Sequence, residues 1–426
     1  GWYRVRILEG DVPMSDSTEA DADADEAATL RTPIVAVLGH VDHGKTTLLD
    51  KIRGSAVSEG EAGAITQHIG ATAVPLSTIS EMAGELVDPT DFDLPGLLYI
   101  DTPGHHSFST LRSRGGALAD IAVLVVDVND GFQPQTEEAV DILKRTQTPF
   151  IVAANKVDTV PGWNPNEGVP IQESMEQQSE RVQGDLNERL YGIIGELSDH
   201  DFAADMYWRV QNFQNNVGVV PVSAMTGEGV PDLLTVLMGL SQRYMKDEMQ
   251  IDVAGPGAGT VLEVKEAQGF GTTVDAVLYD GTIREDDELV VGGLEAPITT
   301  DVRALLQPKP LEEIRTDQAF EKVPEVSAAA GVKIAAPDLD DAMAGAPIRV
   351  VRNRDRGRVI ADVEEELAEI EVTTEEQGVV VKADTLGSLE AIASTLDEVD
   401  IPIVRAEVGD VAPRDVRVAE TADEEK

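Results

Sequence analysis

Short apolar runs alternate with longer amphipathic stretches over the first half of the chain. Apolar runs at residues 34–38, 97–100, 121–126, 150–154 and 219–222 predict buried strands. Helical periodicity between them predicts helices at residues 46–53, 134–147, 173–197 and 230–246. Strands separated by helices are typical of a mostly parallel sheet with helices on both faces. We therefore expect one α/β domain over residues 31–250.

The pattern changes after residue 250. Short or alternating apolar segments at residues 260–265, 273–279, 288–291 and 298–306 are separated by turn pairs such as Asp280-Gly281 and Gly292-Gly293. This pattern predicts an antiparallel β-barrel over residues 251–350. Residues 351–426 begin with a linker and a helix-like stretch at 364–370. A β-α-β pattern at 379–383, 386–396 and 403–407 then predicts a partial α/β domain.

The first 30 residues differ from the rest of the chain. Residues 1–13 lack the long apolar core of a secretory signal peptide, so they are either a floppy terminus or sequence upstream of a natural start at Met14. Residues 15–28 are acidic and of low complexity. We expect a disordered acidic extension over residues 1–30.

Charge changes this picture of an ordinary globular chain. The 426 residues carry 33 Lys+Arg against 79 Asp+Glu, a net charge of −46, and the cations are 22 Arg and 11 Lys. An excess of acid that is spread along the chain, with few lysines, favours a halophilic protein. In multimolar salt the Debye length falls to about 3 Å and self-repulsion is screened. The alternative is an ordinary acidic protein with acidic tails.

Composition also excludes several classes of function. The charge disfavours a surface that coats nucleic acid. The chain has no cysteine, which excludes disulfides, thiolate metal sites and thiol nucleophiles and is typical of a reducing cytoplasm. Its apolar runs are much shorter than the roughly 18 residues needed to span a bilayer, so we expect no membrane segment.

The strongest local motif follows the first apolar run. It reads Gly39-His40-Val41-Asp42-His43-Gly44-Lys45-Thr46-Thr47 and matches G-x4-G-K-[ST] between a predicted strand and a predicted helix. In this context backbone N–H groups cradle phosphate oxygens. Lys45 would reach the β- and γ-phosphates, and the Thr46 hydroxyl would bind Mg²⁺. The motif therefore predicts a nucleotide-binding P-loop.

A second motif, at the end of another predicted strand, points to the base. It reads Asn155-Lys156-Val157-Asp158. The Asp158 carboxylate can accept hydrogen bonds from guanine N1–H and from its 2-amino group, which adenine cannot match. Lys156 can lay its aliphatic stem along the base. A third motif, Ser223-Ala224-Met225, would close over the guanine edge.

Loop residues between these motifs are candidates for metal binding and catalysis. Asp101 can hold Mg²⁺ through water, and the Gly104 amide can sense a γ-phosphate. Thr66 is a candidate second hydroxyl ligand of Mg²⁺. His105 follows Gly104 where a group that positions the hydrolytic water is needed. Four more histidines lie nearby, but two of them fall inside the phosphate cradle, which disfavours a zinc site.

Together these motifs resemble one family. The strings GHVDHGKTTLLD, GAITQHIGA, DTPGHHSF, NKVD and SAMTGEG resemble translational GTPases, and more narrowly the bacterial initiation factor two and eukaryotic initiation factor five-B family in its archaeal form. The resemblance implies GTP and GDP as ligands, with Asn155 helping Asp158 to read guanine. It also implies an apolar gate at Val41 and Ile65 and a K⁺ or Na⁺ ion beside Asp42.

The resemblance implies partners as well. A member of this family is expected to be a cytoplasmic monomer that joins ribosomal subunits, contacts ribosomal RNA, positions initiator methionyl-tRNA and hydrolyses GTP when the ribosome stimulates it. The family's long helix and tRNA-binding barrel are absent from this chain, so we expect a fragment or a shortened coding sequence. The alternatives are an elongation or selenocysteine-delivery GTPase and a truncated ribosome-binding module without useful turnover.

A basic cluster interrupts the acidic sequence. Five arginines fall within ten residues, at Arg349, Arg352, Arg354, Arg356 and Arg358. Such a cluster can bind ribosomal RNA phosphates. It can equally form ion pairs with the abundant carboxylates of the chain. The sequence leaves both interpretations open.

Overall fold

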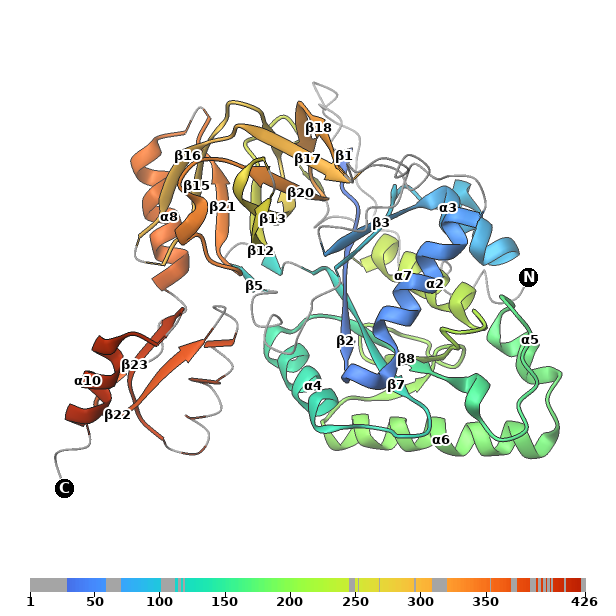
Figure 1. Cartoon of the computed structure of the whole chain (residues 1–426). Helices are drawn as coiled ribbons and strands as arrows, with labels where there is room; N and C mark the ends of the chain where they lie inside the picture. Colours follow the sequence, from blue (N-terminus) through green and yellow to red (C-terminus); the bar gives the residue numbers. More distant parts are fainter. Residues whose placement is uncertain are drawn as a thin grey trace, which may run out of the picture.

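A seven-stranded sheet forms the centre of the first part of the chain in the computed structural model (Figure 1). The structure describes residues 29–58, 70–100, 112–113, 116–117, 119–244, 250–251, 253–267, 269–294, 296–308, 320–352, 354–368, 374–383, 388–389, 392–393, 396, 399, 401–409 and 411–422. The strand order is β3 (Ala71–Pro75), β4 (Gly96–Ile100), β2 (Ile34–Gly39), β7 (Ile121–Asp127), β8 (Phe150–Asn155), β10 (Val217–Pro221) and β9 (Ala204–Met206). All neighbours run parallel except β3 and β4. The five predicted apolar runs form the five inner strands.

Helices cover both faces of this sheet. One face packs against α4 (Pro134–Thr146) and α6 (Glu180–Asp199). The other face packs against α2 (Lys45–Ser58), α3 (Leu76–Ala83) and α7 (Val230–Tyr244). Neighbouring residues of β7 serve opposite sides: Leu124 belongs to the first cluster and Val123 to the second, because successive strand side chains point to opposite faces. The predicted α/β architecture is confirmed.

Several elements differ from the sequence-based prediction. The single helix expected over residues 173–197 is two helices, α5 (Ile171–Glu176) and α6, because Ser179 is extended and its side chain accepts a hydrogen bond from Val182 N at 3.5 Å. Strand β1 (Thr29–Leu30) lies inside the expected disordered extension. It pairs with β11 (Gln250–Ile251), which keeps it ordered. The edge strands β3 and β9 were not predicted.

A curled antiparallel sheet of eight strands follows. Its order is β16 (Ile298–Asp301), β15 (Glu288–Val291), β21 (Pro347–Val350), β12 (Ala258–Ala267), β13 (Gly271–Asp280), β20 (Ala330–Ala335), β17 (Ala304–Pro308) and β18 (Phe320–Val323). A small pair, β14 (Thr282–Arg284) and β19 (Glu325–Ser327), completes it. Val302 and Arg303 interrupt the strand expected over residues 298–306, which is two strands, β16 and β17. The antiparallel barrel-like architecture is confirmed, with many more strands than the alternation predicted.

The α/β part and the curled sheet share an apolar contact. Val277 of β13 is fully buried and belongs to the same cluster as Ala71 of β3. Leu262, Tyr279 and Ala329 pack against that cluster from the same side. The contact places the curled sheet against the edge of the seven-stranded sheet.

Helix α8 (Arg356–Ala368) leads into a third, smaller part. Its apolar residues Val359 and Val363 pack on Val290 and Val351 at the curled sheet. Beyond it, β22 (Thr374–Ala383) and β23 (Ile403–Val408) run parallel, and α10 (Pro413–Ala422) packs against them. Among the described residues, no helix is long and apolar enough to cross a membrane.

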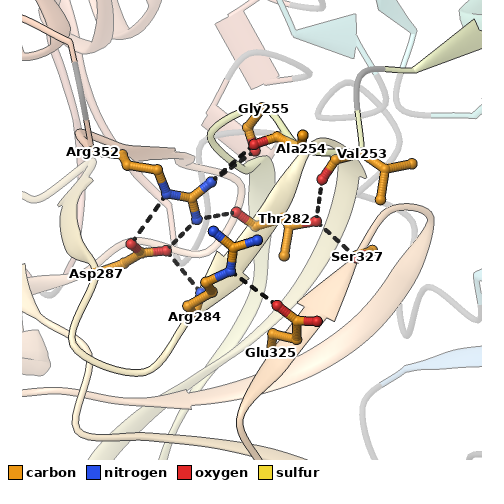
Figure 2. A network of polar contacts seen from close by, with 9 residues as sticks. All are labelled: Val253, Ala254, Gly255, Thr282, Arg284, Asp287, Glu325, Ser327 and Arg352. Atoms are coloured by element: carbon orange, nitrogen blue, oxygen red, sulfur yellow. Dashed lines mark hydrogen bonds and ion pairs between the residues drawn. The ribbon is translucent and has the colours of Figure 1, made fainter. Parts of the chain in front are cut away.

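Most of the arginine cluster fastens α8 and the entry segment to the curled sheet. Arg349 pairs with Glu366 of α8, Arg352 with Asp287 at 2.6 Å, and Arg356 with Glu288 at 3.2 Å. Figure 2 shows that the Arg352 guanidinium also donates to the carbonyl oxygens of Gly255 at 3.0 Å and Thr282 at 2.9 Å. Arg354 and Arg358 are exposed. Three of the five arginines therefore serve internal ion pairs.

Candidate nucleotide-binding site

The P-loop follows β2 and passes through a short 3-10 turn, η1 (Val41–His43), before α2 begins at Lys45. Two glycines allow this path. Gly39 has φ 131°, and a Cβ there would lie 2.2 Å from the Val125 carbonyl oxygen. Gly44 has φ 88°, and a Cβ there would lie 2.5 Å from Asn155 Nδ2. Only glycine fits both positions, so the motif glycines are required by the backbone path itself.

Lys45 folds back across the loop. Its Nζ donates to the carbonyl oxygens of Gly39 at 2.6 Å and His40 at 2.8 Å. Thr46 and Thr47 follow, exposed, in the first turn of α2, where backbone N–H groups lack intrahelical partners and attract anions. The Lys45 ammonium group and the N-terminus of α2 thus both contribute positive charge at the P-loop. This arrangement can bind phosphate groups.

The two other notable P-loop side chains have opposite exposures. His43 is fully buried, its Nδ1 lies 3.3 Å from the Val125 carbonyl oxygen, and its ring meets His40 edge-on at 5.0 Å. Burial lowers the pKa of His43 although its hydrogen bond to Val125 opposes this, so the ring is neutral near pH 7. Val41 is 64% exposed, and its N–H donates to Gln135 Oε1 at 3.3 Å.

Asn155 joins the P-loop to the third motif. It ends β8 and is buried, with both ends of its amide used. Nδ2 donates to the His43 carbonyl oxygen at 2.8 Å, and Oδ1 accepts from the Ala224 N–H at 2.9 Å. Three motifs that are far apart in the sequence therefore meet at the carboxyl ends of β2, β8 and β10, where open α/β sheets bind ligands.

Lys156 is held in place by a residue that was not predicted. Its backbone is left-handed at φ 68°, and Nζ pairs with Asp127 Oδ2 at 2.7 Å. Asp127 ends β7, and its other oxygen accepts from the backbone and side chain of Asn129, both at 2.9 Å. Burial alone would raise the pKa of Asp127, but the hydrogen bonds from Lys156 and Asn129 outweigh it and hold the pKa below its ordinary value.

Asp158 lies beside the third motif. It belongs to the turn η6 (Val157–Thr159), and its Oδ1 accepts a hydrogen bond from Ser223 Oγ at 2.5 Å. Ser223 and Ala224 are buried, whereas the Met225 side chain is 70% exposed. Asp158 and the loop of Ser223 are thus brought together as the base-reading hypothesis requires.

The remaining predicted site residues fall outside the described part of the chain. These are Ile65, Thr66, Asp101, Gly104 and His105. Within the described ranges, no group of three or more His, Asp or Glu side chains is arranged to hold a metal ion. The described site therefore covers the loops for phosphate and base but not the two loops expected to sense the γ-phosphate.

Sequence reasoning missed three side chains around the site. Asp127 contacts Lys156, Gln135 contacts Val41, and the Glu228 carboxylate contacts Thr226 in the Ser223 loop. Asp127 had a usable signal, because a carboxylate directly after a buried strand lies at the edge that binds ligands. Glu228 falls within the string SAMTGEG, but nothing in that string marks it as a buried acceptor, and Gln135 has no comparable signal in the linear sequence.

Comparisons with known proteins agree with this geometry. Residues 30–243 match the family model of the elongation factor Tu GTP binding domain, and residues 352–425 match that of translation-initiation factor 2. The chain is 79% identical over 411 residues to a probable translation initiation factor IF-2 of Haloarcula marismortui, a match covering 96% of this chain and 68% of that protein. A second relative, a probable translation initiation factor IF-2 of Natronomonas pharaonis, is 76% identical, and the match covers 97% of this chain and 68% of that protein.

A solved structure is similar over most of the chain. It is GDP-bound aIF5B from Aeropyrum pernix, with a TM-score of 0.85 and 51% identity, covering 92% of this chain and 67% of that one.

The halophilic relatives support the salt-adapted interpretation of the charge. High identity over nearly the whole chain, the matching fold and the joined nucleotide motifs lead to one conclusion. The chain belongs to the translation initiation factor IF-2 family of GTPases.

Proposed function

We propose that this chain binds GTP and hydrolyses it on the ribosome during translation initiation. One observation carries the proposal: Asn155 bonds to the P-loop at His43 and to the third motif at Ala224. That contact brings phosphate-binding and base-reading groups into one site. The related aIF5B structure contains GDP, which supports the same ligand here. We also propose that domain boundaries lie at residues 30, 250 and 350.

Each described motif residue then has a chemical task. The amides of the loop from Gly39 to Thr47 and the Lys45 ammonium bind and orient the β- and γ-phosphates. Asp158 accepts from guanine N1–H and the 2-amino group, while Lys156, fixed by Asp127, lies along the base. The main catalytic contributions of such a site are positioning and electrostatic stabilisation.

The donor set also suits a magnesium ion. Thr46 is exposed and directly follows Lys45 in the chain, and hydroxyl and carboxylate oxygens are the ligands that Mg²⁺ prefers. When bound, this ion neutralises charge on the phosphates. Thr46 and Thr66 would bind it directly and Asp101 through water. Exposed Asp42 would hold K⁺ or Na⁺.

His105 would hold the hydrolytic water in line with the γ-phosphate. Its Nδ1 or Nε2 would accept a hydrogen bond from that water. Val41 and Ile65 would form an apolar gate that keeps His105 away until the ribosome orders the site. The exposed Val41 side chain is consistent with such a gate. We further propose ribosomal stimulation, subunit joining, a monomeric state and a cytoplasmic location. Initiator-tRNA positioning is proposed for the full-length protein, which in this family carries the tRNA-binding barrel.

A GTPase assay in molar KCl, with and without both ribosomal subunits, tests the function. We expect weak intrinsic turnover and strong stimulation by the subunits. His105→Ala should remove the stimulated turnover and leave GTP affinity nearly unchanged, whereas loss of GTP binding would refute its role. Absence of stimulated turnover in the wild type would favour a ribosome-binding module instead.

Base selectivity tests the site separately. Asp158→Asn should exchange guanine preference for xanthine preference, because the amide can donate where the carboxylate only accepts. Binding of GTP and XTP to both proteins is the measurement. An unchanged preference for GTP in the variant would contradict the assignment of Asp158.

A further inference from the structure

A buried carboxylate lies behind the loop that follows β10. Glu228 has no exposed surface. Its Oε1 accepts hydrogen bonds from Trp163 Nε1 at 3.1 Å, from Asn166 N at 3.0 Å and from Ser174 Oγ. Its Oε2 accepts from Thr226 Oγ1 at 2.5 Å. One side chain thus gathers donors from the segment before α5, from α5 itself and from its own loop.

A continuous chain of hydrogen bonds runs from Glu228 to Asp158. Thr226, which Glu228 holds through its hydroxyl, donates its N–H to Ser223 Oγ at 3.1 Å. Ser223 Oγ in turn donates to Asp158 Oδ1 at 2.5 Å. The Ser223 N–H also donates to the Glu228 carbonyl oxygen at 2.9 Å. Both the hydroxyl and the backbone of Ser223 are therefore oriented by contacts that lead to Glu228.

The backbone reinforces this connection. Gly168 N–H donates to the Thr226 carbonyl oxygen at 3.1 Å, and Gly229 N–H donates to the Val169 carbonyl oxygen at 3.0 Å. Asp232, one turn into α7, accepts from Ile171 N–H at 2.8 Å. The segment from Trp163 to α5 is thus attached to the base loop at several points although it contains none of the motif residues.

The chemistry of Glu228 exceeds what packing requires. An apolar side chain of similar volume would fill this space without burying a charge, and such replacements are often neutral or stabilising. Only a carboxylate can accept four hydrogen bonds and so fix donors from separate segments in set directions. Burying Glu228 costs desolvation, and its chain of hydrogen bonds ends at Asp158, the carboxylate assigned to the base. We take this as a sign that Glu228 orients Asp158.

We infer that Glu228 is a positioning residue for guanine recognition. Through Thr226 and Ser223 it sets the direction in which Asp158 presents its oxygens to the edge of the base. The inference rests on the proposed function, because it assumes that Asp158 reads guanine. It extends the site to Trp163, Asn166 and Ser174, which donate hydrogen bonds to Glu228.

Two substitutions interrupt the chain at different points. Glu228→Gln keeps the size of the side chain but turns one acceptor into a donor, so the Thr226 hydroxyl loses its acceptor and must rotate to accept from the new amide. Thr226→Val removes the hydroxyl that bonds to Glu228 Oε2 but leaves the three hydrogen bonds to Oε1, from Trp163, Asn166 and Ser174, in place. Thr235→Val is the matched control: its hydroxyl bonds to the Pro231 carbonyl oxygen at 2.7 Å within α7.

The measurement is the dissociation constant for GDP and for IDP in molar KCl, with thermal unfolding recorded alongside. Inosine lacks the 2-amino group, so the ratio of the two constants reports how well Asp158 reads that group. We expect Glu228→Gln and Thr226→Val to weaken GDP binding by roughly tenfold, the equivalent of one hydrogen bond to a charged group, and to lower the GDP preference several-fold. Thr235→Val should leave the ratio unchanged.

The outcomes separate the two claims. Equal loss of GDP and IDP affinity in Thr226→Val would show a merely structural role and overturn the inference. An unchanged ratio, in a protein whose guanine preference is lost on Asp158→Asn, would also overturn it while leaving the proposed function intact. If the wild type shows no guanine preference at all, the proposed function fails and the inference fails with it.

Discussion

Replacement of Asn155 by alanine should weaken nucleotide binding more than it weakens the fold. The change removes the hydrogen bond to the His43 carbonyl oxygen (2.8 Å) and the one from Ala224 N–H (2.9 Å). Each buried polar group left without a partner costs about 1–3 kcal/mol. Because two such groups are left, we take about 2–3 kcal/mol for the pair. That corresponds to roughly a 30- to 150-fold loss of affinity.

Titration of a fluorescent GDP analogue in molar KCl measures this loss, with the thermal midpoint of unfolding followed in the same samples. Asn216→Ala is the matched control, because Asn216 Nδ2 bonds only locally, to the Asn212 carbonyl oxygen at 3.1 Å. An affinity for Asn155→Ala within threefold of that control would refute the reasoning. A lower unfolding midpoint with unchanged affinity would refute it as well.

Three further predictions concern stability. Asp120→Asn should lower the free energy of unfolding by about 3–5 kcal/mol, because it leaves the buried Arg31, now paired through two 2.6 Å contacts, without its partner; an unchanged urea midpoint would contradict this. Burial raises the pKa of Asp232 from 3.8 to about 6, against hydrogen bonds from Tyr207 and Ile171. The native state therefore binds more protons than the unfolded state in that window, and wild type should lose stability relative to Asp232→Asn as pH rises from about 4 to about 6. An equal difference in unfolding free energy between the wild type and Asp232→Asn at both pH values would contradict this prediction. Finally, dilution of KCl from molar to millimolar should lower the thermal midpoint, because a net charge of −46 repels itself once screening is lost; a salt-independent midpoint would rule out halophilic adaptation.

The sequence predicted the inner strands well for a physical reason. Strands such as β7 and β8 are buried on both faces, so they appear as continuous apolar runs that few other structures require. The edge strand β3 is only partly buried and ends in Pro75, and β9 has three residues, so neither leaves such a run. In the curled sheet, β20 and β21 were missed because their pairing with distant strands has no local signature.

The site shows the same division between local and distant causes. The P-loop was recognisable because a strand, a glycine-rich turn and a helix start must follow one another in the sequence. The amide of Asn155 was assigned only to the base, whereas its contacts hold two loops together. Contacts such as Lys156 with Asp127, or Thr226 with Glu228, depend on how strands and loops meet in three dimensions, so no spacing rule reveals them.

Arg352 has a mechanical consequence. The chain enters the curled sheet at residues 253–255 and leaves it at Arg352. Figure 2 shows that this guanidinium bonds to Gly255, where the chain arrives, and to Asp287, whose neighbour Glu288 pairs with Arg356 at the start of α8. The two ends of the curled sheet therefore share one anchor. We therefore expect a displacement of the incoming segment to reach the start of α8 through these contacts. The curled sheet therefore does more than separate the α/β part from α8, because one side chain in it connects the segments that lead to both.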